Sequence, residues 1–210
     1  MLEGVISKKV KDAVLIKVWP IIDHIGHWLD DSYDAISQEH WMYLVSNARR
    51  GDILLSRSAN PFSNLFIPGK VTHASVITSE NPSWPTVVEA VALKRKVIES
   101  SLYDFLKSKR LLIHCRPKFI SKEGAGLAAD FAKELIGTAY DKVFSLKNEE
   151  LYCSELVRVV YQKAYSTTIP KDYDISFPLK TKVRYGEEMY LPDDIRLDSD
   201  NWEVVWSNIK

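Results

Sequence analysis

The chain has 210 residues, which is enough for one domain with a complete hydrophobic core, or for one domain and an extension. Its 28 basic and 28 acidic residues cancel, so the composition indicates neither a nucleic-acid-binding surface nor a strong field that steers charged ligands. Two cysteines, Cys115 and Cys153, provide neither a disulfide framework nor a metal-binding spacing, and they favour a reducing compartment.

The N-terminal part is predicted to be helical over residues 5–48, with a break at Trp19-Pro20. Residues 13–29 are rich in apolar side chains, but charged residues interrupt them, and the stretch is too short and too polar to span a bilayer. The pattern is compatible with residues 5–30 contacting a membrane surface as amphipathic helices. The chain begins without the pattern of a signal peptide, which predicts a cytoplasmic protein.

Four short apolar segments follow and are predicted to be strands, over residues 52–57, 70–78, 86–92 and 110–116. The helix before them is expected to start near Ser37 and to end at Gly51. Residues 58–69 contain Asn, Ser, Gly and two prolines, which predicts a long loop, and residues 102–107 are predicted to be a short helix. The chain is therefore expected to divide into an N-terminal helical extension, 1–49, and a main domain, 50–210.

The second half is predicted to contain two amphipathic helices and a polar tail. The first helix covers residues 123–136 and is capped by Gly137, and the second begins at Cys153. The tail, 169–210, is rich in proline and charge, with a last strand at 203–206. Together these elements predict an α+β fold, a mostly antiparallel sheet packed against helices on one side.

Cys153 lies where an irregular segment gives way to the second helix. Apolar residues follow it at helical spacing, so its helix is expected to pack inward: Leu156, Val157, Val160, Tyr161 and Ala164. The N–H groups and partial positive charge of a helix N-terminus favour the thiolate, which is the nucleophilic form of cysteine. A free cysteine is more often a small core residue, so this interpretation requires a base and an orienting group elsewhere in the chain.

His73 and Glu89 can supply those groups. His73 lies in an apolar strand, and Glu89 is the one acid in the apolar run 86–92. A buried glutamate requires a partner. A hairpin centred near Asn81-Pro82 would set His73 opposite Glu89, where the carboxylate could accept the imidazole N–H and fix its tautomer. The sequence then holds a thiol, a base and an orienting carboxylate.

Other candidate sites are weaker. His24 and His27 have a metal-ligand spacing, but no acid or cysteine completes a set, so no metal is expected. His114 and Cys115 are adjacent in a predicted strand and must point to opposite faces. No phosphate-binding or dinucleotide-binding glycine motif occurs, and no cofactor is predicted.

Four segments together resemble the circularly permuted papain-like amidases, the YiiX-like branch of the NlpC-type cysteine hydrolases, which are related to the lecithin retinol acyltransferase group. These segments are Arg50-Gly51-Asp52-Ile53-Leu54-Leu55, Thr72-His73-Ala74-Ser75-Val76-Ile77, Glu89 and Tyr152-Cys153-Ser154-Glu155-Leu156. The resemblance covers about residues 50–165, and more loosely the tail at Leu191-Pro192-Asp193-Asp194-Ile195. It implies a permuted papain-like catalytic domain over residues 50–210.

The resemblance implies that Cys153 is the nucleophile, His73 the base and Glu89 the third member of a catalytic triad. It also implies that Tyr140 lines the site and helps to stabilise the oxyanion, a role that Tyr152 could share. Its two branches imply different substrates, either small cell-wall peptides with unusual amide bonds or acyl chains of lipids. The reaction therefore stays open between hydrolysis and acyl transfer, and a binding module without turnover is the remaining alternative.

Overall fold

The computed structural model describes residues 36–58, 67, 69–79, 81, 84–142, 144–145, 149–168, 181–184 and 187–209. The predicted helices before residue 36, including the expected membrane-contacting segment 5–30, lie outside these residues, as do 59–66 and 68 of the predicted long loop. Within the described ranges, no helix is both long enough and apolar enough to cross a membrane.

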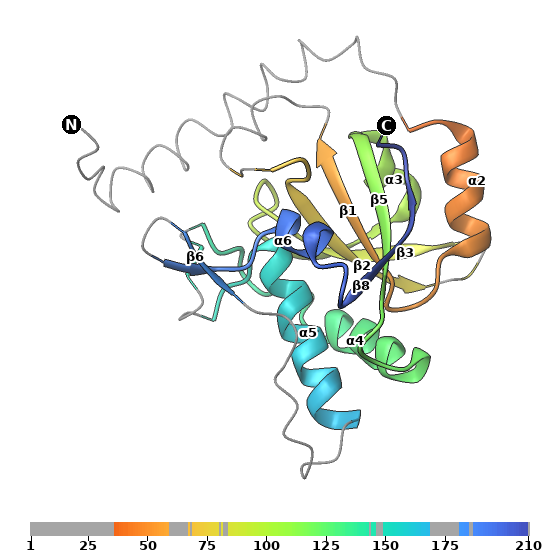
Figure 1. Ribbon diagram of the computed structural model, residues 1–210. Coiled ribbons are helices and arrows are strands. Elements are labelled where there is room, and N and C mark those ends of the chain that lie inside the picture. The colour runs from red at the N-terminus through yellow and green to blue at the C-terminus, as the bar shows by residue number, and fades with distance from the viewer. Residues whose placement is uncertain are drawn as a thin grey trace.

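A six-stranded antiparallel sheet forms the centre of the fold (Figure 1). Its spatial order is β4-β3-β2-β1-β5-β8. The strands are β1 (Ile53–Ser58), β2 (His73–Ser79), β3 (Thr86–Val91), β4 (Lys96–Ser101), β5 (Lys109–Pro117) and β8 (Trp202–Ser207). Two short strands, β6 (Lys182–Arg184) and β7 (Glu187–Met189), form a separate hairpin.

Five helices are present in the described part of the chain: α2 (Gln38–Asn47), α3 (Leu102–Lys107), α4 (Lys122–Glu134), α5 (Cys153–Thr168) and α6 (Pro192–Leu197). Helices α4 and α5 cover one face of the sheet, and α2 and α3 cover the other. Neighbouring residues of one strand point to opposite faces, so Val76 packs with the α4 and α5 side and Ile77 with the α2 and α3 side. The α+β class is confirmed, but the expectation of helices on one side is wrong, since both faces are apolar and both are covered.

Most predicted elements are present within a few residues of their expected bounds. Helix α3 has the predicted bounds, and α5 begins at Cys153 as predicted. Strand β4, the β6–β7 hairpin and helix α6 were not predicted. The sequence of β4, Lys-Val-Ile-Glu-Ser-Ser, has little apolar signal because the strand lies at the sheet edge, where only one of its six residues is fully buried.

The turn before β1 brings the sheet into close contact with α4 and α5. Gly51 has a φ of +84°, a conformation that other residues rarely adopt, and a Cβ built there would lie 2.1 Å from the carbonyl oxygen of Ala125 in α4. The buried hydroxyl of Tyr161 in α5 donates a hydrogen bond to the Gly51 carbonyl. Only glycine therefore fits this turn, which holds the α4–α5 pair against the strands.

Candidate active site

Cys153 is the first residue of α5, and only 1% of its surface is exposed. The helix is fixed on the sheet by its buried apolar face, which includes Leu156, Val157 and Val160. The backbone N–H groups of Ala74 and Ser154 are hydrogen-bonded to the sulfur. The N–H of Ser154 belongs to the N-terminus of α5 and that of Ala74 to β2, and both stabilise negative charge, so this position favours a thiolate.

His73 is the first residue of β2, and its imidazole is close enough to Cys153 for a side-chain hydrogen bond. The other side of the ring faces the acid, with His73 Nε2 at 2.7 Å from Glu89 Oε2. A carboxylate accepts hydrogen bonds, so Nε2 carries a proton and Nδ1 is the nitrogen left for the thiol. The ring of Phe105 in α3 lies 6.1 Å from the imidazole and covers it from the helix side.

The predicted strand register is wrong by two residues. Glu89 pairs with Ser75, not with His73, and an irregularity between Ile77 and Ser79 shifts the hairpin. Because the shift is even, His73 and Glu89 still point to the same face as diagonal neighbours. Two long side chains can bridge a diagonal pair, which explains why their hydrogen bond forms despite the different register.

Glu89 is held at both oxygens. Ser100 in β4 donates a hydrogen bond to Oε1 at 2.7 Å, while Oε2 faces His73. Burial raises the pKa of Glu89, but the hydrogen bond and charge of His73, the charge of Lys109 and the Ser100 hydroxyl outweigh burial and lower the pKa to about 2. The carboxylate is therefore ionised at neutral pH and fixed in orientation. Sequence reasoning missed Ser100 because β4 itself was not predicted.

The charges of His73 and Cys153 support each other. Burial lowers the pKa of His73, but hydrogen bonds to Cys153 and Glu89 and the charge on Cys153 raise it to about 8. Burial raises the pKa of Cys153, but the His73 hydrogen bond and charge and two backbone N–H groups lower it below its usual range. The arrangement favours a thiolate–imidazolium pair near neutral pH.

Cys115 provides an internal comparison. It is as buried as Cys153, but it lies in the middle of β5 among apolar side chains. Burial and the nearby charge of Asp52 raise its pKa to about 12, so it stays a thiol. His114 points to the opposite face, as predicted, where its Nε2 lies 2.7 Å from Asp52 Oδ2. Arg116 also pairs with that carboxylate, so Asp52 of the Gly-Asp-Ile-Leu segment belongs to a separate buried network.

Lys109 is a charged neighbour of the site that sequence reasoning did not identify. It begins β5, opposite Ser58 at the end of β1, and its Nζ lies 4.6 Å from the centre of the Phe105 ring. Burial lowers the pKa of Lys109, while the charges of Glu89 and Cys153 raise it. In the sequence, Lys109 is distinguished only by its position at the start of a strand. The β1–β5 pairing is needed to show that it lies near His73.

The two predicted tyrosines occupy different surroundings. Burial and then the charge of Cys153 raise the pKa of Tyr140 well above its usual range, which places this phenol near the sulfur. Tyr152 is 1% exposed, and its hydroxyl accepts a hydrogen bond from the backbone N–H of Tyr190 at 3.0 Å. The contacts of Tyr152 are thus with the C-terminal segment, and Tyr140 is the better placed of the two to line a substrate site.

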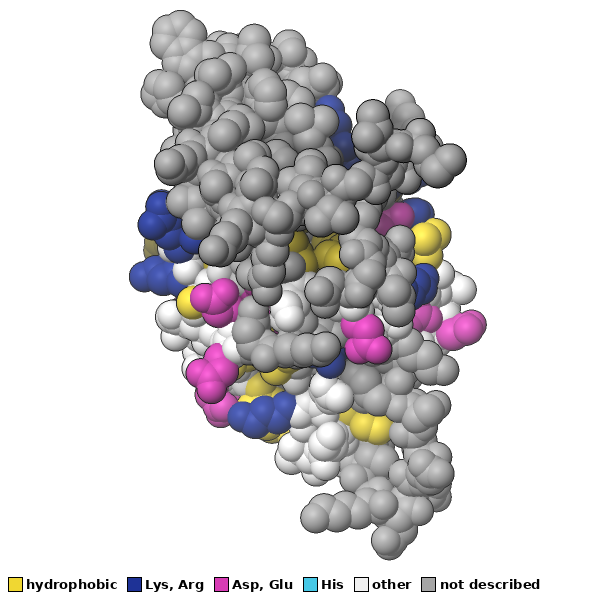
Figure 2. All heavy atoms as spheres, turned by 90° about the vertical axis from the view of Figure 1, so that its left-hand side faces the viewer, with side chains coloured by type: hydrophobic (Ala, Val, Ile, Leu, Met, Phe, Trp, Pro, Cys, Tyr) yellow, Lys and Arg dark blue, Asp and Glu magenta, His cyan; other side chains and the backbone are white. Residues whose placement is uncertain are grey.

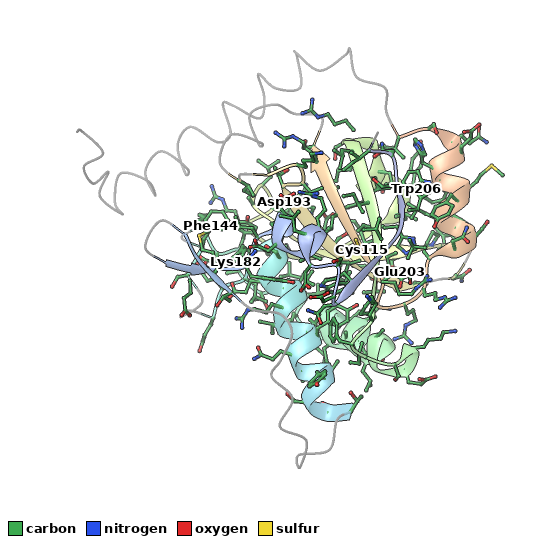
Figure 3. All side chains as sticks on the ribbon, in the orientation of Figure 1. Cys115, Phe144, Lys182, Asp193, Glu203 and Trp206 are labelled. Atoms are coloured by element: carbon green, nitrogen blue, oxygen red, sulfur yellow. The ribbon has the colours of Figure 1, made fainter. Side chains whose placement is uncertain are left out.

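The C-terminal segment connects the strand of His73 to the helix of Cys153. The Ser154 hydroxyl donates to the Tyr190 carbonyl at 2.5 Å. Asp193 in α6 accepts hydrogen bonds from the backbone N–H groups of Lys70 and Val71, at 3.1 and 3.4 Å, just before β2. Figure 1 shows α6 beside the N-terminal end of α5, and Figure 3 labels Asp193 there. The segment Tyr190 to Arg196 therefore contacts α5, which carries Cys153, and the residues just before β2, which carries His73.

Among the described residues, no cluster of three or more His, Cys, Asp and Glu side chains could hold a metal ion. His24 and His27 lie outside the described ranges.

The chain is similar in sequence to a known family and to one curated protein. A model of a family described as permuted papain-like amidase enzyme, YaeF/YiiX, C92 family, matches residues 47–205. The uncharacterized protein YiiX of Escherichia coli (strain K12) is 34% identical over 84 residues, which cover 36% of this chain and 42% of that protein. The chain thus aligns with less than half of that curated relative.

A solved structure is similar over most of the chain. It is described as the crystal structure of metalloprotein yiiX from Escherichia coli O157:H7, DUF1105. The TM-score is 0.57 and the sequence identity 25%, over 77% of this chain and 98% of that one. The similarity in sequence and the similarity in structure therefore point to the same group of proteins.

Proposed function

This chain belongs to the permuted papain-like amidase family, and membership of that family supports a hydrolase function. We propose that the protein is a cysteine-dependent hydrolase of amide, ester or thioester bonds. Cys153 is the nucleophile, and His73 is the general base and acid. Glu89 orients the imidazole and stabilises its protonated form. The single observation that carries this proposal is the connected chain from the Cys153 sulfur through the His73 ring to the Glu89 carboxylate.

The proposed reaction follows from the protonation states. The Cys153 thiolate attacks the carbonyl carbon, a carbon–sulfur bond forms, and the carbonyl oxygen becomes an oxyanion. Tyr140 is the proposed donor to that oxyanion. The imidazolium of His73 then donates its Nδ1 proton to the leaving group as the bond to the leaving atom breaks. Water attacks the resulting thioester, His73 accepts its proton, and the thiolate and a carboxylic acid are released.

Acyl transfer shares the first half of this reaction. If an alcohol or amine attacks the thioester in place of water, the enzyme is a transferase with the same three residues. A module that binds without turnover requires no thiolate at all. The pKa values of the site favour catalysis over such a module, because pure binding gives no reason to lower the pKa of Cys153 and to raise that of His73.

The first test measures thiolate character without a known substrate. Iodoacetamide at neutral pH should alkylate Cys153 much faster than Cys115, as followed by mass spectrometry of the intact protein and its peptides. Cys115 is the matched control thiol, because both sulfurs are almost completely buried and only their pKa values differ in direction. Equal rates at the two cysteines would contradict the proposed mechanism.

The second test looks for the covalent intermediate. The wild-type protein is incubated with a panel of acyl thioesters, esters and peptide amides, and its mass is recorded over time. An acyl adduct on Cys153 that is absent from Cys153→Ser supports an enzyme and identifies the substrate class. Loss of the adduct in water indicates hydrolysis, and loss only after an added amine or alcohol indicates transfer. Activity that persists in Cys153→Ala would overturn the assignment of the nucleophile.

A further inference from the structure

Lys109 has a charge that nothing in the described structure neutralises by direct contact. Its described contact is the one with the face of Phe105, and its ammonium has neither an ion pair nor a hydrogen bond with any described residue. Glu89, the nearest acid by electrostatic effect, has both oxygens engaged by His73 and Ser100. An ammonium has three donors, and a half-buried one normally finds an acceptor.

The position of this ammonium relates it to the reacting atoms. Lys109 pairs with Ser58, and Ser56, two residues earlier in β1, pairs with His73. The Phe105 ring contacts both Lys109 and His73. The charges of Lys109 and Cys153 act on each other directly. A cation on the same side of the sheet as the base, fixed on the same aromatic ring, is placed to meet part of a bound substrate.

We propose that Lys109 binds a carboxylate of the substrate, so that the preferred acyl compound carries its negative charge close to the carbonyl that Cys153 attacks. This inference rests on the proposed function, and it adds the class of substrate. A carboxylate supplies the acceptors that the ammonium lacks, in a site sheltered from water, where charge-assisted hydrogen bonds are strong.

The overall charge of the protein does not provide the same preference. The formal net charge is zero, and on the face in Figure 2 the described acidic and basic side chains are interspersed. A long-range field would therefore attract an anion and its neutral analogue almost equally. A preference for the anion must arise locally, which makes it testable at one residue.

Iodoacetate and iodoacetamide are matched probes for this test, since they differ only in a carboxylate against a carboxamide. With both, the Cys153 thiolate forms a carbon–sulfur bond and iodide leaves with the electron pair. The measurement is the ratio of the two alkylation rates at Cys153, at constant pH and ionic strength. A change in the thiolate population alters both rates alike, so the ratio isolates recognition of the carboxylate.

Lys109→Met keeps the length of the side chain over Phe105 and removes its charge. We expect it to lower the iodoacetate-to-iodoacetamide ratio about tenfold or more, which is typical of losing one charge-assisted hydrogen bond. Lys109→Arg should retain most of the ratio. Lys107→Met is the control, because it removes the same charge from a lysine of α3 that pairs with Asp104 and is 57% exposed. It should leave the ratio within about twofold of wild type.

The outcomes separate the two proposals. Selective alkylation of Cys153 with a ratio that Lys109→Met does not change would overturn the inference about Lys109 alone. An equal drop in Lys107→Met would also overturn it, because the effect would then be a general field. Equal, slow alkylation of Cys115 and Cys153 in the wild-type protein would overturn the proposed function and the inference together. Thermal unfolding of each variant confirms that the fold is intact.

Discussion

Replacing Glu89 with glutamine removes the charge that supports His73 while keeping the shape of the side chain. The amide oxygen can still accept the Nε2 proton of His73, and the Ser100 hydroxyl can rotate to accept from the amide nitrogen. The variant should therefore fold, keep the imidazole tautomer and lose mainly the electrostatic contribution. This makes Glu89→Gln a sharper test of the third member of the site than a truncation would be.

The magnitude follows from the pKa values. The pKa of Glu89 is lowered from 4.5 to about 2, which corresponds to a net of about 3 kcal/mol that remains after burial has opposed the effects of His73, Lys109 and Ser100. The pKa of His73 is raised from 6.5 to about 8, or by about 2 kcal/mol, with Cys153 and Glu89 as the contributors. Loss of the Glu89 charge should thus lower the pKa of His73 by roughly one unit or more.

The assay is the pH dependence of iodoacetamide alkylation at Cys153. A less basic His73 loses its proton at lower pH, so the limb of the profile in which the thiolate–imidazolium pair becomes a thiolate beside a neutral imidazole should move to lower pH by about one unit. Glu99→Gln is the matched control, since Glu99 is in the same strand as Ser100 but bonds to Thr78 and Thr86. A Glu89→Gln profile that overlays the wild-type profile would refute the role of this carboxylate.

Stability gives a second reading of the same variant. Glu89 has a depressed pKa, so its contribution is complete above about pH 4.5 and is lost as pH falls towards 2. His73 has a raised pKa, so its contribution is complete below about pH 6.5 and is lost as pH rises through 8. The difference in unfolding free energy between wild type and Glu89→Gln should therefore be largest between about pH 4.5 and 6.5, as measured by urea denaturation across this range.

Four further variants test the residues around the site. Asp193→Ala frees two backbone N–H groups before β2 and should cost about 1–2 kcal/mol of stability and lower the rate at Cys153, as urea denaturation and alkylation would measure. Gly51→Ala combines a positive φ with a contact of 2.1 Å and should cost about 3 kcal/mol or more, seen as a lower urea midpoint. Tyr152→Phe should lower thermal stability with little change in turnover, whereas Tyr140→Phe should lower turnover about tenfold or more with little change in stability, and the reverse pattern would exchange their roles.

The sequence was sufficient to predict that Cys153, His73 and Glu89 lie together, because each is in conflict with its local surroundings. A glutamate in an apolar strand, a histidine in the strand before it and a cysteine before an amphipathic helix all require a partner, and they satisfy one another. The supporting residues carry no such conflict. Ser100 and Lys109 look like ordinary polar residues at strand ends, and their importance depends on pairings across β3–β4 and β1–β5. Asp193 acts on a strand more than a hundred residues earlier in the chain.

The register error shows which part of such a prediction must be right. The hairpin was expected to pair His73 with Glu89, and the structure pairs Ser75 with Glu89. A shift of one residue would have moved His73 to the α4 and α5 face and separated it from the acid. A shift of two keeps both on one face and changes an opposite pair into a diagonal one, which side chains of this length still bridge at 2.7 Å. Strand alternation is fixed by the apolar pattern, whereas register depends on the turn and its irregularities. A site that requires only a shared face can therefore be inferred before the turn geometry is known.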